Sequence, residues 1–471
     1  EIPCGMQEQF LEAKELIESS NDIKIYTHTD CDGICSGAIL SIILDRLNKD
    51  YEIEFVNLDE IEDLDLDHKL TIFSDLGSGQ GVDKNAKDGQ KILILDHHPP
   101  LRDINYKNDK AYTYLEINPM FYGIDGSYYV CGGGLCYFLA KTFGFKDLSW
   151  IGVLSAIGDM QNNKTGHFEG LNEIIQEDAI NEGLLKVTKN DLNIYGRSTR
   201  PLYVALSYFS DVKLPITNNQ QEAKVVLEEL GVDEKHNRKT LSEVTEEDKM
   251  EIKKFLSRMI SKRVPPKYLK YVPKLIVGDA YTFLNEEEGS FLRDGSEFST
   301  AMNACGRNRK EAIGVDIIKG DRLVALDALE EVSKTHKYNL ATSISKVADN
   351  YHSEIIELDN FQYFDCSDFD EDIASNIIGT ITGMVLGYCN WKKPILGFSK
   401  PKNNQIKVSL RCSKLLAYDG IHFGNMMREI AKEVGGTGGG HAIACGAYIP
   451  NEKKSEFLDK FNRKLQGKIA N

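Results

Sequence analysis

The sequence lacks several features that would assign it to a specialised class. It has no run of about 18 or more apolar residues, so we expect no membrane-spanning helix and no membrane partner. No CxxC pair occurs among its ten cysteines, which argues against a zinc ribbon and favours reduced thiols in a cytoplasmic protein. The chain also has no basic, apolar and small-residue signal at its start, no internal repeat and no low-complexity tract.

The net charge of −16 argues against a protein that coats nucleic acid. It does not exclude a nuclease, because carboxylates that hold metals add negative charge and a local basic strip can bind the strand. One such strip, residues 253–274, holds eight Lys or Arg residues, two interleaved Tyr and no acidic residue. A solvated face is the more common role of such a run, and a nucleic-acid surface is the alternative.

Length and patterning predict an α/β protein with more than one domain. The 471 residues exceed one ordinary hydrophobic core. Buried apolar strands separated by helices predict a parallel sheet flanked by helices in the first part of the chain. The candidate strands are residues 23–29, 52–57, 70–74 and 92–95, and the candidate helices are 34–47, 136–142 and 148–157.

The rest of the chain predicts a helical connector followed by a second α/β domain. Residues from about 165 to 260 look mostly helical; Thr245 with Asp248 opens a helix that runs to Lys262, and Pro265 and Pro266 stop it. The later candidate strands are residues 275–278, 313–318, 395–398, 406–410 and 444–449. The expected domains are 1–165, a connector at 166–264, and a smaller α/β domain at 265–471 with a polar helical insertion at about 321–360.

The first of four acidic clusters lies where a strand ends and a helix begins. It contains His28, Asp30, Asp32 and Gly33. Two carboxylates that are two residues apart on a tight turn can diverge toward two ions, and Gly33 permits the turn. Calcium loops and plain turns also contain this DxDG pattern, so the cluster alone is weak.

The other three clusters follow buried apolar segments in the same domain. Asp75 ends one strand, Asp96 with His97 and His98 follows another before two prolines, and Asp159 follows an apolar helical stretch. Open parallel sheets place ligands at such strand ends. Alone, each position also reads as a helix cap, a polar strand end or a turn.

Together the four clusters predict a metal centre. Carboxylate and imidazole ligands suit Mn²⁺ or Mg²⁺. Two ions about 3.5–4 Å apart can activate water for in-line attack on phosphorus. Asp96 would orient one imidazole from behind.

A second constellation lies near the end of the chain. Residues 436–441 read GTGGGH, and Arg411 ends an expected strand. A Gly-rich stretch lets backbone N–H groups approach a phosphate, and an Arg offers a bidentate fork. A flexible loop after a helix at 425–434 is the alternative reading.

These motifs resemble those of a known family. The order DxDG, SD, DHH and GD resembles the DHH phosphoesterase superfamily, and GGGH resembles its DHHA1 domain. Residues 408–413 resemble the SxR strand of that domain. Residues 299–307 resemble the NAxGR segment of RecJ-type nucleases, and the size and insertion look most like archaeal RecJ proteins.

The resemblance implies residue roles. It implies two Mn²⁺ or Mg²⁺ ions with Asp75 as the bridge, and it gives His98 a phosphate contact. His28 fits less well, because related pyrophosphatases place their His four residues before the first Asp, where this chain has Tyr26. The implied metal ligands are Asp30, Asp32, Asp75, His97 and Asp159, with His28 as a further candidate. The implied phosphate-binding residues are Arg411, His441, Gly439, Gly440, Asn303 and Arg307.

The function that the resemblance implies is an exonuclease on single-stranded DNA or RNA, in DNA replication or repair. The alternatives are a phosphodiesterase for short oligonucleotides or cyclic dinucleotides, and a replisome scaffold. The resemblance to archaeal RecJ also implies a replisome partner of the GINS type.

Overall fold

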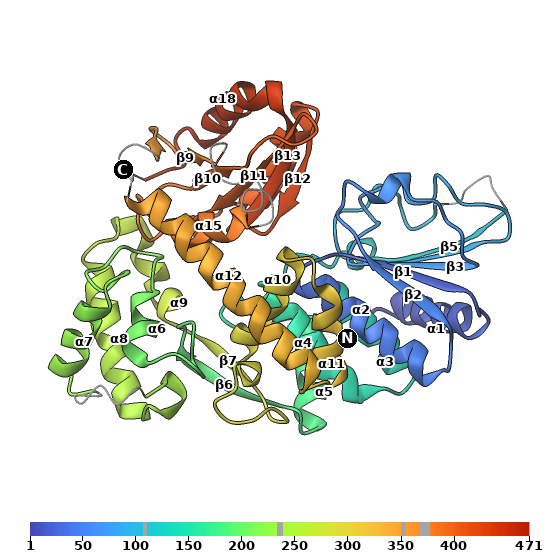
Figure 1. Cartoon of the computed structure of the whole chain (residues 1–471), viewed down its shortest axis with the longest axis horizontal. Coiled ribbons are helices and arrows are strands. Elements are labelled where there is room, and N and C mark those ends of the chain that lie inside the picture. Colours follow the sequence, from blue (N-terminus) through green and yellow to red (C-terminus); the bar gives the residue numbers. More distant parts are fainter. Residues whose placement is uncertain (107–110, 233–238, 350–354, 367–376, 471) are drawn as a thin grey trace. The chain divides into compact units, whose positions relative to one another are not determined.

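The computed structural model describes residues 1–106, 111–232, 239–349, 355–366 and 377–470. The chain forms two compact units, and each is built from two separate stretches of sequence (Figure 1). Unit 1 comprises Glu1–Lys189 and Asp279–Ser333. Unit 2 comprises Asn190–Gly278 and Lys334–Asn471.

Unit 1 is built around a five-stranded sheet in the order β2-β1-β3-β4-β5, with every pair parallel. The strands are β1 (Ile23–Thr27), β2 (Tyr51–Phe55), β3 (Leu70–Ser74), β4 (Lys91–Leu95) and β5 (Thr113–Ile117). The four expected strands of this region are therefore confirmed, and β5 is an additional one.

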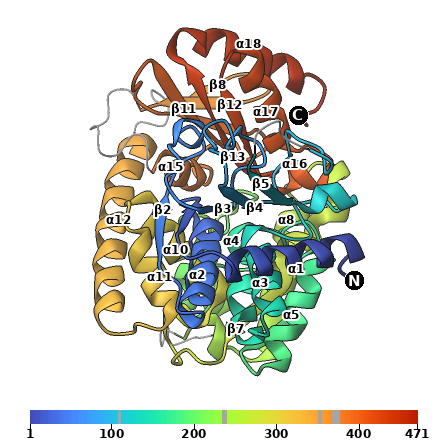
Figure 2. The same cartoon turned by 90° about the vertical axis from the view of Figure 1, so that its right-hand side faces the viewer.

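The two faces of this sheet are covered differently. Ile72 of β3 packs on one face of the sheet, in the large core that includes the helices. Its neighbour Phe73 packs on the other face, against residues that lie between β2 and β4. Helices α1, α2 and α3 contact the first of these faces (Figure 2). The helices of unit 1 are α1 (Cys4–Glu18), α2 (Cys31–Arg46), α3 (Gly132–Thr142), α4 (Ser149–Gly158), α5 (Leu171–Asn181), α10 (Gly295–Arg307) and α11 (Glu311–Lys319).

The expected strand at 313–318 is wrong, because these residues lie within α11. The run is short and apolar, and such runs do not distinguish a strand from a buried helix. Val315 and Ile317 are buried against the helical core, and Gly320 ends the helix with a φ of 115°. The expected strand at 275–278 is half right, since it spans the end of α9 (Val272–Ile276) and the start of β7 (Val277–Phe283).

Residues 279–333 lie in unit 1, although we expected them in the last domain. Their helices α10 and α11 contact α2 and α4. Buried apolar side chains such as Met302 and Cys305 complete the core of unit 1, so the chain returns there before it enters unit 2 for the second time. The β6 (Leu185–Leu192) and β7 strands pair as a two-stranded ribbon, and α12 (Val324–Asp349) confirms a helix in the expected insertion.

Unit 2 combines a helical region with a six-stranded mixed sheet in the order β12-β13-β11-β10-β9-β8. Its strands are β8 (Ile356–Glu357), β9 (Gln362–Asp365), β10 (Ile395–Phe398), β11 (Gln405–Arg411), β12 (Thr437–Gly440) and β13 (Ala444–Pro450). Its helices are α6 (Leu202–Ser207), α7 (Gln220–Glu229), α8 (Glu246–Ser261), α9, α15 (Ile378–Val385), α16 (Lys414–Tyr418), α17 (Phe423–Glu433) and α18 (Lys454–Leu465).

The structure also describes the cysteines and the helices noted in the sequence. All ten cysteines are free thiols, and all but Cys4 are buried. No helix in the described part of the chain is both long and apolar enough to cross a membrane.

Candidate metal centre

The four acidic clusters converge at the carboxyl ends of β1, β3 and β4. Two groups of three side chains each bring one ligand atom per residue within 4.8 Å of one another. One group is His28, Asp30 and Asp75, and the other is Asp32, His97 and Asp159. Every metal ligand expected from the sequence, including His28, is therefore in one place, and each group offers oxygen and imidazole donors.

Asp75 lies between the two groups. Its Oδ1 is 3.2 Å from Nε2 of His97, and its Oδ2 is 3.7 Å from Nδ1 of His28. Oδ2 is buried and has no hydrogen-bond partner, and the residue has a φ of 57°, in the left-handed region. A carboxylate with one oxygen toward each group has the geometry of a bridge between two ions.

The end of strand β1 explains how His28, only two residues before Asp30, can reach the carboxylates. Nδ1 of His28 is 3.2 Å from Oδ2 of Asp30, whereas Tyr26 points into the core on the other face of the sheet and stacks on Phe73. Side chains two positions apart point to the same face only within a strand. Strand β1 ends at Thr27, so His28 need not share the face of Tyr26. The turn then brings His28 toward the carboxylates.

The carboxylates of this centre repel one another. Burial, and then the charges of Asp32 and Asp30, hold the pKa of Asp75 well above its usual value. Burial alone would lower the pKa of His97, but the carboxylates of Asp159 and Asp32 outweigh it and raise that pKa. A bound divalent cation would relieve this excess of negative charge.

His97 is held so that Nε2 faces the carboxylates. Its Nδ1 lies 2.6 Å from the carbonyl oxygen of Gly126, so the proton on Nδ1 is donated there and Nε2 is left as a ligand. Gln161 donates to the same carbonyl at 2.9 Å and to Oδ2 of Asp159 at 3.1 Å. One amide thus orients two of the candidate ligands.

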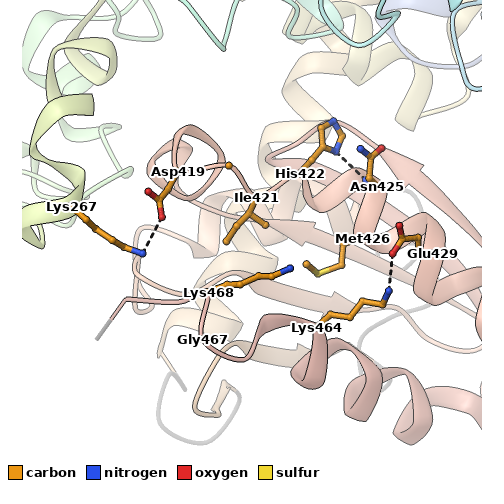
Figure 3. Close-up of a pocket in the computed structure, with 11 residues that line it drawn as sticks. Lys267, Asp419, Ile421, His422, Asn425, Met426, Glu429, Lys464, Gly467 and Lys468 are labelled. Carbon is orange, nitrogen blue, oxygen red and sulfur yellow. Dashed lines mark hydrogen bonds and ion pairs between the residues drawn. The ribbon is translucent and has the colours of Figure 1, made fainter.

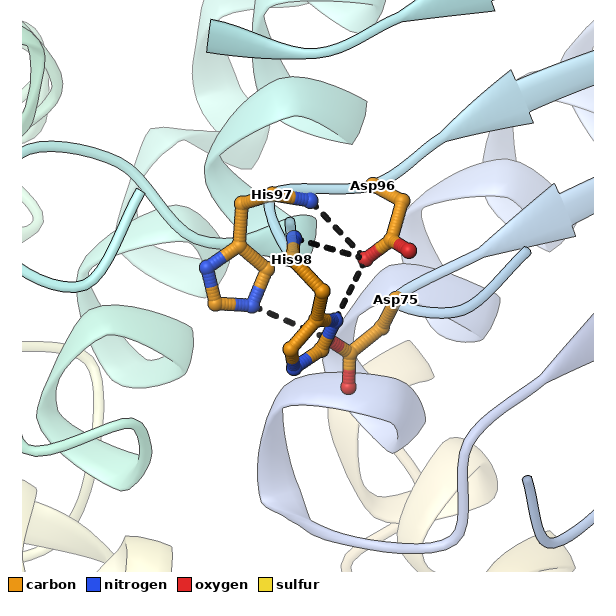
Figure 4. Close-up of side chains that lie close together, drawn as sticks. All are labelled: Asp75, Asp96, His97 and His98. Atoms are coloured by element: carbon orange, nitrogen blue, oxygen red, sulfur yellow. Dashed lines mark hydrogen bonds and ion pairs between the residues drawn. The ribbon is translucent and has the colours of Figure 1, made fainter. Parts of the chain in front are cut away.

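Asp96 orients the second His of the pair (Figure 4). Its Oδ1 is 2.6 Å from Nδ1 of His98 and also accepts from the backbone N–H of His97, and its Oδ2 accepts from the N–H of Ser78. Asp96 is fully buried, whereas the His98 side chain is 36% exposed. Nε2 of His98 is therefore the nitrogen that can reach a substrate.

Two glycines at the start of α3 hold the Asp32 carboxylate. Gly132 and Gly133 donate their N–H groups to its two oxygens at 3.0 and 2.6 Å, and the Ser155 hydroxyl also donates to it. A Cβ at position 132 would lie 2.7 Å from Cβ of Asp75, so only glycine fits. Sequence reasoning missed these residues, although the GGG run at 132–134 was a visible signal.

The NAxGR segment belongs to this unit and supports the first cluster. Oδ1 of Asn303 accepts from the backbone N–H of Cys31 at 2.9 Å, at the start of α2. A Cβ on Gly306 would lie 1.8 Å from the carbonyl oxygen of Thr29, so α10 approaches this turn closely. The segment thus fixes the turn that carries Asp30 and Asp32. Phosphate contacts by Asn303 and Arg307 stay a prediction.

The second constellation comes together in unit 2. Arg411 at the end of β11 pairs in register with Ala444, and His441 donates its N–H to the carbonyl of Ala444 at 2.9 Å. Residues 437–440 form β12 rather than a flexible loop. The glycine-rich strand, His441 and Arg411 therefore share one end of the sheet.

A separate hollow of about 550 Å³ in unit 2 is lined by polar side chains (Figure 3). Its lining residues are Lys267, Asp419, Gly420, Ile421, His422, Asn425, Met426, Glu429, Lys464, Gly467 and Lys468. Lys267 pairs with Asp419 at 3.0 Å and Lys464 with Glu429 at 2.7 Å. Two of its three lysines are thus neutralised, which does not favour an anion site.

Comparison with known proteins places the chain in a family. The DHH family N-terminal domain matches residues 22–153, the DHH-CID domain 194–272 and the DHHA1 domain 359–467. An uncharacterized protein of Methanocaldococcus jannaschii is 31% identical over 446 residues, which cover 93% of this chain and 92% of the relative. The chain belongs to the DHH phosphoesterase superfamily.

Other proteins resemble part or nearly all of the chain. A second uncharacterized protein of Methanocaldococcus jannaschii is 30% identical over 39% of this chain and 54% of its own length. The structure of CDC45 from Entamoeba histolytica has a TM-score of 0.60 at 15% identity and covers 98% of this chain and 99% of that one. RecJ in complex with Mn²⁺ from Thermus thermophilus has a TM-score of 0.53 at 12% identity and covers 99% of this chain and 55% of that one. At these identities the likeness shows a shared fold.

The candidate site fits the metal dependence of a DHH phosphoesterase. The buried, unpartnered Oδ2 of Asp75 is an atom that a cation would satisfy, and the mixed Asp and His donors suit Mn²⁺ or Mg²⁺. His/Asp clusters of this kind are typical of the DHH family, so the chain is a metal-dependent phosphoesterase by family and by site.

Proposed function

We propose that this DHH protein hydrolyses single-stranded DNA or RNA from an end with two bound Mn²⁺ or Mg²⁺ ions. The observation that carries the proposal is the position of Asp75, which belongs to one ligand group and has its Oδ1 3.2 Å from Nε2 of His97 in the other. When bound, two such ions activate water and neutralise the charge that develops on the phosphate. The fold shared with Mn²⁺-bound RecJ along 99% of this chain supports the choice of metal and of substrate class.

The protein's own residues would divide the work between them. Asp30, His28 and Asp75 would hold one ion, and Asp32, His97, Asp159 and Asp75 the other. His98, fixed by the buried Asp96, would contact a phosphate oxygen through Nε2. In unit 2, Arg411 and His441, with the backbone of Gly439 and Gly440, would hold phosphates of the strand.

A scaffold role is the second candidate, which the resemblance to RecJ-type proteins implies; the fold shared with CDC45 along 98% of this chain is compatible with either role. The complete set of ligand side chains in the two groups favours catalysis. A GINS-type replisome partner is a separate proposal that rests on the resemblance to archaeal RecJ. A pull-down with the intact chain and with a variant that lacks residues 321–360 tests this partner and the part of the insertion in binding it.

One digestion experiment separates the functions. End-labelled DNA and RNA 20-mers and a dinucleotide are incubated with the protein and Mn²⁺, and the products are mapped in time. We expect successive shortening of a single strand from one end. Cleavage of the dinucleotide alone would favour the short-oligonucleotide reading, and no cleavage of any substrate would favour the scaffold.

A further inference from the structure

Two arginines in unit 2 have no acidic partner among the described residues. Nη1 of Arg411 donates to the carbonyl of Leu410 at 2.7 Å, and Nη1 of Arg428, on α17, donates to Oδ1 of Asn425 at 3.0 Å. Burial lowers the pKa of both guanidinium groups. An arginine stays charged at physiological pH, so each is a partly buried cation that lacks an anion.

The lack of a partner does not reflect a shortage of acids on α17. Glu429, the next residue after Arg428, turns away toward the hollow of Figure 3 and pairs with Lys464. Asp419, at the end of α16, pairs with Lys267 in the same hollow. The acids of this region therefore neutralise lysines, while the arginine beside them is left for another anion.

Arg428 lies against the glycine-rich strand. A Cβ on Gly439 would be 2.9 Å from Nη2 of Arg428, and the φ of Gly439 is 151°. A Cβ on Gly424, at the start of α17, would be 2.1 Å from the carbonyl oxygen of Gly440. Glycine at these positions lets α17 and its guanidinium approach the backbone of β12 with no side chain between them.

The sheet register connects the two arginines. Gly439 pairs with Gly446, which pairs with Ser409, so these three small residues form one row across β12, β13 and β11. Arg411 is two residues beyond Ser409 and lies on the same face, as the approach of Gly379 to both side chains confirms. Arg428 lies at the Gly439 end of this row, and Arg411 lies near Ser409 at its other end.

We propose that Arg428 is a second substrate-binding arginine, which holds a phosphate of the substrate together with Arg411 over the row of small residues. The inference rests on the phosphodiester substrate of the proposed function. Two guanidinium forks beside exposed backbone can contact one phosphate from two sides. The ligand class is a phosphodiester strand, and the role is binding rather than metal retention.

The test compares Arg428→Gln with Arg463→Gln, which removes the same charge from an exposed position on α18. Binding of a single strand is measured at several salt concentrations, beside kcat, KM and thermal unfolding. We expect Arg428→Gln to weaken binding by about ten- to a hundredfold and to reduce the salt slope by about 0.7. Arg463→Gln should leave both close to wild type.

Two further readouts separate binding from folding. Arg428→Lys keeps the charge and should restore the salt slope but only part of the affinity, because a Lys cannot reproduce the fork. The unfolding temperature of Arg428→Gln should stay the same or rise, since an unpaired, partly buried cation is removed. Unchanged affinity and slope in Arg428→Gln, or a lowered unfolding temperature with wild-type affinity, would overturn the inference.

The wild-type protein in the same experiment separates this inference from the proposed function. If wild type degrades the strand and Arg428→Gln matches Arg463→Gln, only the role of Arg428 fails. If wild type hydrolyses the dinucleotide but not the strand, the exonuclease proposal fails. The same two variants are then compared on the dinucleotide. A KM that is raised in Arg428→Gln but not in Arg463→Gln supports the arginine pair, and an unchanged KM in Arg428→Gln overturns it.

Discussion

The metal centre of unit 1 and the arginine site of unit 2 are opposite in charge. In unit 1, Asp30, Asp32, Asp75 and Asp159 crowd around two His, and one buried carboxylate oxygen has no hydrogen-bond partner. In unit 2, Arg411 and Arg428 lie beside a glycine-rich strand without an acid among the described residues. Among the described residues each site has an excess of one charge, which fits a divalent cation in unit 1 and the phosphate that we propose for unit 2.

A third cluster gives the balanced case. The buried Asp191 contacts both Arg197 and Lys249, and Lys249 also contacts Glu246 at 3.2 Å, so two carboxylates meet two cations inside unit 2. Clusters whose charges balance hold a fold together, whereas those with an excess of one sign point to a ligand. Changes at the unbalanced sites should therefore affect ligands and turnover, and changes at the balanced one should affect stability.

Removal of the metal ions should have the largest effect on activity. Chelation should abolish hydrolysis, because no group of the chain can replace the cations that the carboxylates of unit 1 require. Mn²⁺ should restore activity better than Ca²⁺, since the donors include imidazole. The measurement is the rate on an end-labelled strand after dialysis against chelator and after each addition. Full activity in chelator would contradict the metal centre.

The next largest effect is expected from Asp75→Ala. The variant should keep less than about a tenth of wild-type kcat, a loss above about 1.4 kcal/mol in activation free energy, because the carboxylate between the two ligand groups is lost. It should fold normally, since a crowded buried carboxylate has been removed. The matched control is Asp63→Ala, at an exposed position of the same unit, and metal content is measured for both. A kcat above that limit would mean that Asp75 is not the bridge.

The sequence could predict the ligands because each one follows a local pattern. A short apolar strand that ends in Asp or His is visible in a few residues, and parallel pairing then brings those ends together. This accounts for Asp30, Asp75 and His97. Asp159 follows the apolar helix α4 rather than a strand, and the fold brings it to the same cluster. The sequence also suggested the end of the second sheet, where Arg411 and the GGGH motif lie.

What the sequence could not show depends on distant contacts. Gly132 and Gly133 hold Asp32 from 100 and 101 positions away, and the GGG run alone does not show which carboxylate it contacts. Residues 279–333 return to unit 1 after the connector, so chain order misplaced Asn303. Arg428 looks like an ordinary helix residue until the structure places it against Gly439.

The arginine site should respond more weakly than the metal centre. Arg411→Ala and His441→Ala should each weaken binding of a single strand by about 1.5–3 kcal/mol while the metal content stays at the wild-type level. An arginine cannot ligate a cation, so its loss should spare the metals. For Arg411→Ala the salt dependence of Kd should also be shallower, because one fewer counterion is released. Loss of bound metal from Arg411→Ala would show that the two sites are not separate in role.

The smallest effect on turnover is expected at the balanced cluster. Asp191→Asn should leave kcat near wild type, because Asp191 belongs to neither unbalanced site. It should lower the free energy of unfolding of unit 2 by about 3 kcal/mol, since it leaves Arg197 as a buried cation without this acid and Lys249 with only the exposed Glu246. Asp419→Asn, which breaks the more exposed pair with Lys267, is the control and should cost about 1 kcal/mol or less.

The direction of the pH dependence follows from the pKa of Asp191. Burial alone would raise the pKa of Asp191, but the charges of Arg197 and Lys249 outweigh it, so the pKa lies below its usual value. A lowered folded-state pKa adds stability at neutral pH, and this stability is lost as the pH falls below about 4. The difference in free energy of unfolding between wild type and Asp191→Asn should therefore shrink on acidification.

Denaturation can be followed by the fluorescence of Trp391, which lies in the same core as Leu192. A Trp150→Phe background leaves no other Trp in the chain. A difference that stays constant down to acid pH would mean that the cluster does not owe its stability to the Asp191 charge.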